Sequence, residues 1–188
     1  MGNARAVKNG HNFGISLGYH LDERWSVQTG AIYSRKNYTA IETGYQKVPG
    51  YNSYDPNIKV NKVQAECYMW EIPLNIRYNF LVTRSQKAFI TAGISSYFME
   101  KEDLHYWYTY NNNPRYKAWI NEQNSSYWFS VAGISAGFEQ YITPSISIQA
   151  EPFFRFTLKE VGYGYINLKT MGIFLGVKYS PPPRSSKK

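Results

Sequence analysis

Hydrophobic and polar residues alternate with a period of two along most of the chain, which predicts strands rather than helices. The clearest run covers residues 67–80, where the apolar face includes Trp70 and the polar face includes Glu71. On this pattern we expect seven strands, at residues 12–21, 25–34, 67–80, 88–99, 127–141, 146–158 and 170–179.

The expected strands are long and their connections alternate in length. Most span about 10–14 residues, whereas strands of soluble sheets usually have about five or six. The connections at 21–24, 81–87 and 142–145 are short, 159–165 is intermediate, and those at 40–64 and 100–125 are long. Short turns at one end and long loops at the other are typical of an antiparallel, up-and-down transmembrane β-barrel with periplasmic turns and outer loops.

The glycines indicate which face of the sheet is inside. Eight of the 14 glycines lie in expected strands, and all eight fall on the polar face. A glycine weakens a strand, so it gains nothing on a solvated wall, but inside a narrow barrel it makes room for longer neighbours. We therefore expect a polar lumen and an apolar face toward lipid. A soluble lipocalin-like barrel, with its apolar face inward, is the alternative.

Composition and charge support this picture. Aromatic residues make up 18% of the chain and are expected to form two girdles at the ends of the lipid face. No apolar stretch is long enough for a helical span. The net charge of +8 does not predict nucleic-acid binding, because the basic residues are scattered and form no stripe.

Charged residues of both signs lie in mid-strand on the polar face. We interpret them as a network of ion pairs and hydrogen bonds that fills the lumen, because small barrels pack their interior with side chains. Paired catalytic carboxylates or a selectivity ring are the alternatives. Pro73 and Pro152 also lie in mid-strand, and we expect a bulge at each. The expected lumen residues are Glu71, Arg77, Glu139, Glu151 and Arg155.

The number of expected strands, seven, is odd. Bacterial single-chain barrels have an even number of strands, so we expect an eighth strand before residue 1, unless Trp107–Tyr110 or Ala118–Asn121 supply it. Residues 1–10 would then be an extracellular-side segment or N-terminal remnant, 11–180 the barrel domain, and 181–188 a disordered Pro/Ser/Lys tail.

Several segments carry a further pattern, with Glu71-Ile72-Pro73-Leu74 the most specific. This pattern resembles the outer-membrane β-barrel domains abundant in Bacteroidetes (PorT-like, OmpA/OmpX-type). The resemblance implies an eight-stranded barrel over about residues 11–180 with its first strand missing here, and no shared catalytic residues. The other segments are Gly14-x-x-x-Gly18-Tyr19, Arg24-Trp25-Ser26, Gly93-Ile94-Ser95-Ser96-Tyr97 and Ala150-Glu151-Pro152-Phe153-Phe154.

The most unusual segment is the expected loop at residues 104–119, which is rich in Tyr, Trp and Asn. Aromatic faces with nearby amides could bind an extracellular glycan or protein partner. The alternative is that these rings anchor the loop at the membrane interface or extend the strands. The other expected contacts are outer-membrane lipid and the barrel-assembly machinery. The candidate binding residues are Tyr106, Trp107, Tyr108, Tyr110, Tyr116 and Trp119.

The sequence offers little for catalysis, and we expect a non-enzymatic outer-membrane protein with a structural or surface-binding role. No nucleophile or dinucleotide motif occurs, and the three histidines lack metal-ligand spacing. We therefore expect no metal and no cofactor. A lipid-modifying enzyme is the alternative, and His105 with Ser125 or Ser126 is its one candidate arrangement.

Overall fold

A computed structural model describes residues 3–5, 10–41, 48–51, 57–122, 124–159, 161–162 and 167–181. Most of the expected N-terminal segment 1–10 and of the tail 181–188 lies outside this range. No helix long and apolar enough to cross a membrane occurs in the described part of the chain. The strands are β1 (Asn3–Arg5), β2 (His11–His20), β3 (Trp25–Ile41), β4 (Ile58–Val82), β5 (Gln86–Tyr110), β6 (Asn113–Asn121), β7 (Ser125–Tyr141), β8 (Ile146–Thr157) and β9 (Asn167–Tyr179).

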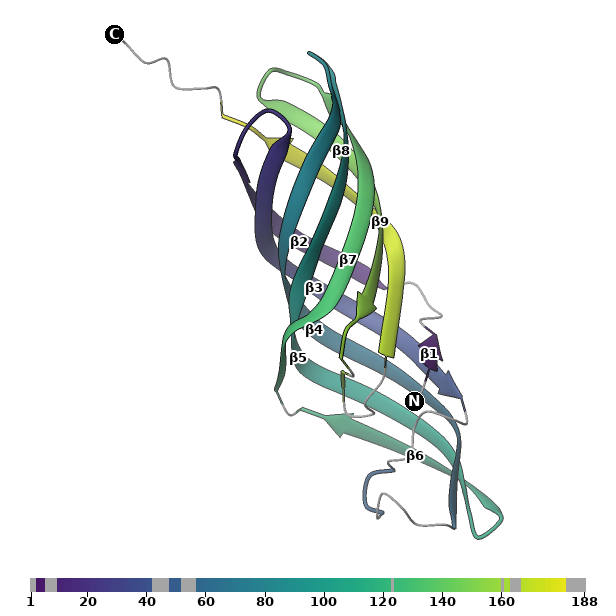
Figure 1. The fold of residues 1–188 in the computed structure, drawn as a ribbon. Coiled ribbons are helices and arrows are strands. Elements are labelled where there is room, and N and C mark those ends of the chain that lie inside the picture. Colours follow the sequence, from purple (N-terminus) through teal and green to yellow (C-terminus); the bar gives the residue numbers. More distant parts are fainter. Residues whose placement is uncertain are drawn as a thin grey trace.

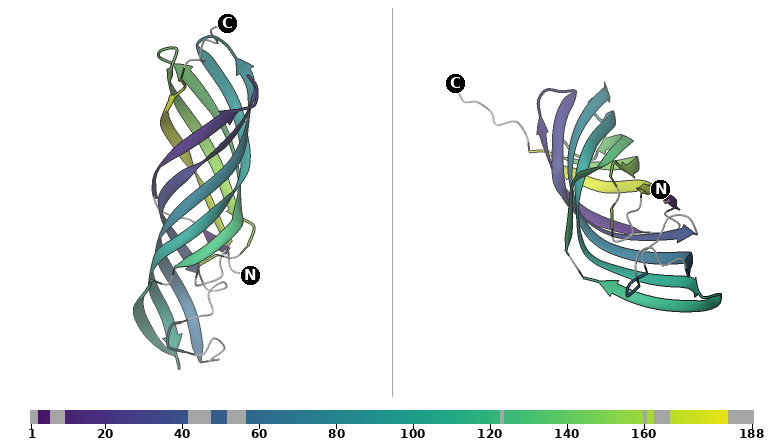
Figure 2. Two further views of the ribbon diagram at one scale, coloured as in Figure 1. Left: turned by 90° about the vertical axis from the view of Figure 1, so that its left-hand side faces the viewer. Right: turned by 60° about the horizontal axis from the view of Figure 1, so that its bottom comes forward.

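All of these strands belong to one sheet in the order β1-β9-β8-β7-β5-β4-β3-β2, with β6 beside β5. The long strands pair antiparallel with their neighbours. The sheet curls around its long axis into a half-barrel (Figures 1 and 2). The predicted fold class, an all-β antiparallel transmembrane barrel, is therefore confirmed.

The two edges of the sheet meet at the end where β1 lies. There β1 runs parallel to β9, with Asn3 opposite Asn167, and Arg5 also pairs with Thr39 of β3. Beyond these rungs, the described residues show no pairing between β2 and β9. The sheet is thus joined at one end and open along the rest of the seam. The eighth strand stays a prediction.

The loops predicted at 40–64 and 100–125 are partly wrong, because strands occupy much of both. β4 already begins at Ile58, and β5 continues to Tyr110 and forms a hairpin with β6. The turn between them is Asn111-Asn112, and both residues have positive φ, the conformation of a two-residue type I′ turn. Residues 107–110 and 118–121 therefore lengthen or pair with β5 and add no new strand to the barrel.

The bulges predicted at the two mid-strand prolines are also wrong. Around Pro73 the ladder to β3 skips two rungs, but the pairs on either side keep the same register. The Thr29 hydroxyl donates to the Pro73 carbonyl at 2.8 Å. Pro152 stays in register opposite Ile173. A proline has no backbone N–H to donate. Here the sheet loses backbone pairs next to the proline, but no extra residue is inserted into the strand.

The strand glycines lie on the inner face, where they make room for long side chains. A Cβ at Gly133 would approach the Arg155 Cγ to 3.2 Å, and one at Gly172 would approach the Phe153 ring to 2.9 Å. A Cβ at Gly137 would overlap the Phe89 ring. These close approaches explain why the small residues and the lumen-filling residues occupy facing positions.

The outward side chains divide β3, β4 and β5 into two parts. Over about 9–11 residues per strand they are apolar and largely exposed, and this is the length of a tilted transmembrane strand. The outward positions of this part hold no charged residue among those described. We call this part the wall. It comprises residues 13–21, 25–33, 70–80, 88–98, 128–138, 146–156 and 171–179.

Beyond the wall the alternation inverts. We call this second part the cap; it comprises residues 35–41 of β3, 58–69 of β4, 99–110 of β5, and β6, and its β4–β6 part projects past the wall in Figures 1 and 2. Its outward positions are mostly polar, including Lys62, Gln64 and Glu66. Its inward positions supply most of the buried apolar cluster of the molecule, including Val63, Met69, Leu104 and Tyr106.

Two irregularities mark the border between wall and cap. Between Met99 and Lys101, β5 has an extra residue, Glu100, relative to β4. At the same level β7 bulges around Phe129, which has a φ of 47°. Bulges are frequent at the rims of barrels, where they redirect side chains. The first bulge shifts the inward positions of β5 from odd to even residue numbers.

Candidate functional site

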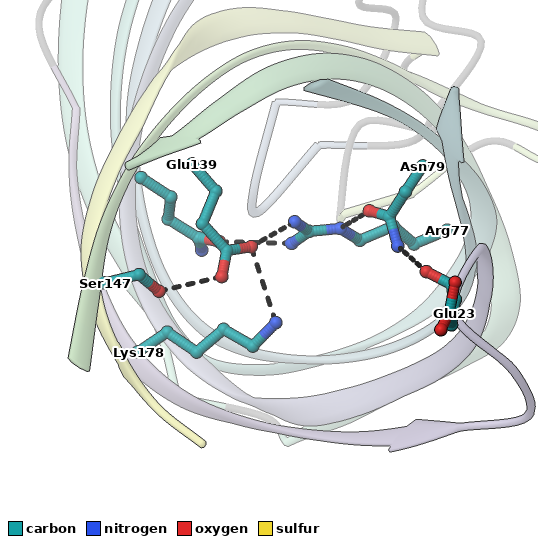
Figure 3. A network of polar contacts seen from close by, with 7 residues as sticks. Glu23, Arg77, Asn79, Glu139, Ser147 and Lys178 are labelled. Atoms are coloured by element: carbon teal, nitrogen blue, oxygen red, sulfur yellow. Dashed lines mark hydrogen bonds and ion pairs between the residues drawn. The ribbon is translucent and has the colours of Figure 1, made fainter. Parts of the chain in front are cut away.

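The lumen end near the short turns holds a network centred on Arg77 and Glu139 (Figure 3). The two side chains form a buried ion pair. The Glu139 carboxylate also accepts from the Ser147 hydroxyl at 2.7 Å and lies 3.4 Å from the Lys178 amino group. The Arg77 Nε donates to the Asn79 side chain at 3.1 Å. One carboxylate is thus shared by two cations.

A second group of polar residues lies further along the lumen. Arg155 forms an ion pair with the buried Glu71. The Ser135 hydroxyl donates to the Glu151 carboxylate at 2.5 Å. The five predicted lumen residues therefore point inward, but the structure separates them into two pairs and a hydrogen-bonded carboxylate rather than one ring.

Aromatic rings fill the space between these charges. The Arg77 guanidinium lies 3.4 Å from the Phe89 ring centroid, and Arg155 lies about 5 Å from the rings of Phe153 and Phe174. These two phenylalanines stack with centroids 4.4 Å apart. Such contacts hold the guanidinium groups in place. The geometry is that of a packed interior and does not present paired carboxylates to a substrate.

Sequence reasoning missed several members of the lumen network. Lys178 and Ser147 were visible as polar positions on the inward face, but their pairing with Glu139 depends on strand order. Lys36 lies buried beside Tyr97 and donates to its hydroxyl. The signal for Lys36 is its even position in β3, which continues the inward face past the expected strand end at residue 34.

The structure contradicts two of the predicted binding residues. Tyr106 and Tyr108 are 0% and 4% exposed, because they occupy inward positions and belong to the core of the cap. Tyr110 and Trp119 are half-buried and pack against the same core. Tyr106 and Tyr108 therefore stabilise the cap from inside and are not available as a surface, whereas Tyr110 and Trp119 keep part of their rings exposed.

Trp107 and Tyr116 do lie on the outer face of the cap. They are opposite each other on β5 and β6, with ring centroids 5.4 Å apart. His105 adjoins both rings, and its Nδ1 lies 2.6 Å from the Tyr116 hydroxyl. Sequence reasoning did not include His105 among the surface residues, although it alternates in phase with Trp107.

The catalytic alternative for His105 is not assembled in this fold. Ser125 and Ser126 pair with Met99 and Phe98 of β5, six or seven residues along the strand from His105. At about 3.3 Å per residue this separates them by roughly 20 Å. The alternative arrangement of His105 with Ser125 or Ser126 is therefore not formed.

Other reactive groups in the described residues are equally structural. Cys67 is a buried free thiol that donates to Glu102 at 3.6 Å. Burial, together with the Glu102 carboxylate, raises the pKa of the Cys67 thiol well above its usual value, the opposite of activation. No cluster of three or more His, Cys, Asp or Glu residues in the described segments could hold a metal ion.

Ion pairs on the outer face of the cap are exposed, unlike those of the lumen. The Arg35 Nε lies 2.6 Å from the Glu66 carboxylate, and both side chains are partly open to solvent. The hydrogen bond from Arg35 lowers the pKa of Glu66. Outward-facing charges of this kind require water on the outside of the cap.

Comparison with known families agrees with this geometry. The sequence matches the family model of the outer membrane protein beta-barrel domain over residues 2–180. A search of curated proteins gave no match. The family match covers nearly the whole chain and every described strand, and its members are outer-membrane proteins of bacteria. The chain therefore belongs to the outer membrane protein beta-barrel domain family.

Proposed function

We propose that the protein is a non-enzymatic barrel that holds the cap above the outer membrane as a binding surface for an extracellular partner. In this proposal it belongs to a Gram-negative, Bacteroidetes-type bacterium and to the PorT-like group. The Glu-Ile-Pro-Leu strand at residues 71–74 supports that assignment. The barrel-assembly machinery inserts the chain, and outer-membrane lipid surrounds the wall.

The observation that carries the proposal is the inversion of the alternation between Met69 and Trp70. Below it the sheet is apolar outside and charged inside, as lipid requires. Above it the sheet is polar outside and apolar inside, as water requires. A sheet that only anchored itself in the membrane would not need a folded core beyond the wall.

The cap lies at the loop end of the barrel, opposite the short turns (Figure 1). In outer-membrane barrels the short turns face the periplasm and the long connections face outward. We therefore place the turn at residues 21–24 in the periplasm and the Asn111-Asn112 turn outside the cell. The proposal includes no pore, because ion pairs and stacked rings occupy the lumen.

Epitope insertion in a Gram-negative host tests both localisation and orientation. One variant carries the epitope between Asn111 and Asn112, and the matched control carries it after Arg84 in a short turn. We expect the protein in the outer-membrane fraction, with a shifted band on unboiled gels. Antibody should bind the first epitope on intact cells and the second only after permeabilisation.

Two results would contradict the proposal. Recovery of the folded protein in the soluble fraction would mean that the apolar wall does not face lipid. Labelling of the Arg84 epitope on intact cells, with the Asn111 epitope hidden, would place the cap in the periplasm and remove the surface-binding role.

A further inference from the structure

We propose that the outer face of the cap binds a neutral saccharide chain on a platform formed by Trp107, Tyr116 and His105, flanked by Lys62 and Asp103. This inference rests on the proposed surface-binding function and names the chemistry of the partner. It concerns the part of the cap that faces away from the buried core.

The height of the platform excludes a role in anchoring the protein to lipid headgroups. Trp107 lies nine residues beyond Phe98, the last outward aromatic residue of the wall on β5. At about 3.3 Å per residue this is roughly 30 Å along the strand. The headgroup layer adds only about 5–8 Å on each side of the hydrocarbon core, so even a tilted strand carries Trp107 well beyond it.

The rings pack against one another but keep part of their surface open to solvent. Trp107 is 36% exposed and Tyr116 is 55% exposed. The His105 ring is nearly parallel to the Tyr116 ring, at 24°, and to the Trp107 ring, at 29°. The Trp107 and Tyr116 rings are tilted by 52° to each other, so the three rings form a stepped aromatic surface. Their partly negative faces attract the C–H groups of a pyranose.

Hydrogen-bonding groups surround this surface. The Lys62 amino group lies 5.2 Å from the Trp107 ring centroid, and an Asp103 oxygen lies 3.5 Å from the His105 Nε2. The Tyr116 hydroxyl contacts the His105 Nδ1. Donors and acceptors of both signs beside an aromatic face suit sugar hydroxyls. The balanced charge of Lys62 and Asp103 favours a neutral chain over a polyanion.

The size of the platform favours a saccharide over a folded protein. Trp107 and Tyr116 together expose roughly 200 Å² of side-chain surface, given the total area of such residues. A stable protein interface takes about 800 Å² from each partner. A sugar chain needs only a few stacked rings and neighbouring hydrogen bonds, and this is what the outer face provides.

Calorimetric titration of the refolded full chain tests the inference. The probes are maltohexaose, cellohexaose and chitohexaose, and the detergent is lauryldimethylamine oxide because maltoside and glucoside detergents would compete. We expect at least one hexaose to bind. Trp107→Ala and Tyr116→Ala should each weaken this binding at least tenfold, and Trp107→Phe should retain most of it.

Trp128→Ala is the matched control, since Trp128 is an exposed tryptophan on the wall, and it should leave hexaose affinity unchanged. Band shifts on unboiled gels identify the variants that fold. Failure of the wild type to bind any hexaose, or equal affinity of the Trp107→Ala and Tyr116→Ala variants, overturns the saccharide assignment. Because the epitope experiment is independent, a cap exposed on cells without sugar binding refutes this inference alone, whereas a hidden cap refutes the proposed function as well.

Discussion

The wall and the cap are built from the same strands but follow opposite rules. In β4, the wall half places Glu71 and Arg77 inside and Ile76 outside, whereas the cap half places Val63 inside and Gln64 outside. β4 runs unbroken through both halves, although its pairing with β5 shifts by one residue at the border. The medium outside therefore decides which side chains each half can display.

The difference also determines what stabilises each half. In lipid, apolar burial between strands gives little, so the wall depends on strand pairing, lipid contact and satisfied lumen charges. In water, the cap gains stability by burying apolar surface against itself. Substitutions at corresponding positions of the two halves should consequently have different effects.

The largest effect is expected from breaking a lumen ion pair. Glu139→Gln keeps the volume but leaves Arg77 and Lys178 without their shared carboxylate (Figure 3). Removing one partner of a buried pair costs about 3–5 kcal/mol. We expect a loss of this size in the free energy of unfolding, measured by urea titration in lipid vesicles.

Glu66→Gln is the matched control for this substitution, because Glu66 pairs with Arg35 on the exposed face of the cap. Exposed ion pairs contribute little, so this variant should unfold at nearly the same urea concentration as the wild type. Equal destabilisation by the two variants would show that ion pairs in the lumen and on the outer face of the cap contribute alike to stability.

The next largest effect should come from the core of the cap. Leu104 is fully buried among the apolar residues of the cap, and Leu→Ala at such positions costs about 2–5 kcal/mol. Because the wall is held by other interactions, Leu104→Ala should loosen the cap first. We expect faster hydrogen exchange at residues 99–121 with little change at 88–98; uniform acceleration would mean that both halves unfold together.

A slightly smaller effect should appear on the lipid face. Ile76 points outward near the middle of the wall on β4. A charged residue at mid-membrane depth on such a face costs about 2–4 kcal/mol. Ile76→Arg should therefore lower unfolding free energy in vesicles by that amount, whereas Gln64→Arg on the outer face of the cap should not. Tolerance of both would argue against lipid at Ile76.

The wall could be predicted from the sequence because lipid imposes a simple rule on every outward position. The cap could not, because its hydrophobic phase is reversed: Val63 and Ala65 continue the inward face of Glu71, but they are apolar where the wall is polar. A search for alternation with polar residues on the inward face therefore ends at about residue 67. The clue was present in the regular alternation of residues 62–69.

The residues of the platform were harder to predict than the lumen residues. Tyr106 and Trp107 look equivalent in the sequence, and their faces are set by the extra residue Glu100 in the bulge of β5. Whether Tyr116 meets Trp107 depends on the two-residue turn at Asn111-Asn112 and the register that follows from it. Pairing across strands is information that a linear pattern does not contain.

The smallest effect is expected in the turn at residues 21–24, which is exposed like the outer face of the cap but joins two strands of the wall. The Asp22 carboxylate accepts from the backbone N–H groups of Arg24 and Trp25 at 2.6 and 2.7 Å. The bond from Trp25, followed by that from Arg24, lowers the pKa of Asp22. A carboxyl with a lowered pKa in the folded state adds stability above its unfolded pKa, and this stability is lost as the pH falls through the folded pKa.

Asp22→Ala should therefore lower the midpoint of thermal unfolding slightly at neutral pH, and the difference from the wild type should shrink as the pH is lowered through the acidic range. Glu23→Ala removes a carboxylate from the same turn without breaking either bond, so it serves as the control. A difference that stays constant with pH would assign the role of Asp22 to turn geometry rather than to charge. In that case the exposed end of the wall would be as insensitive to pH as its apolar face.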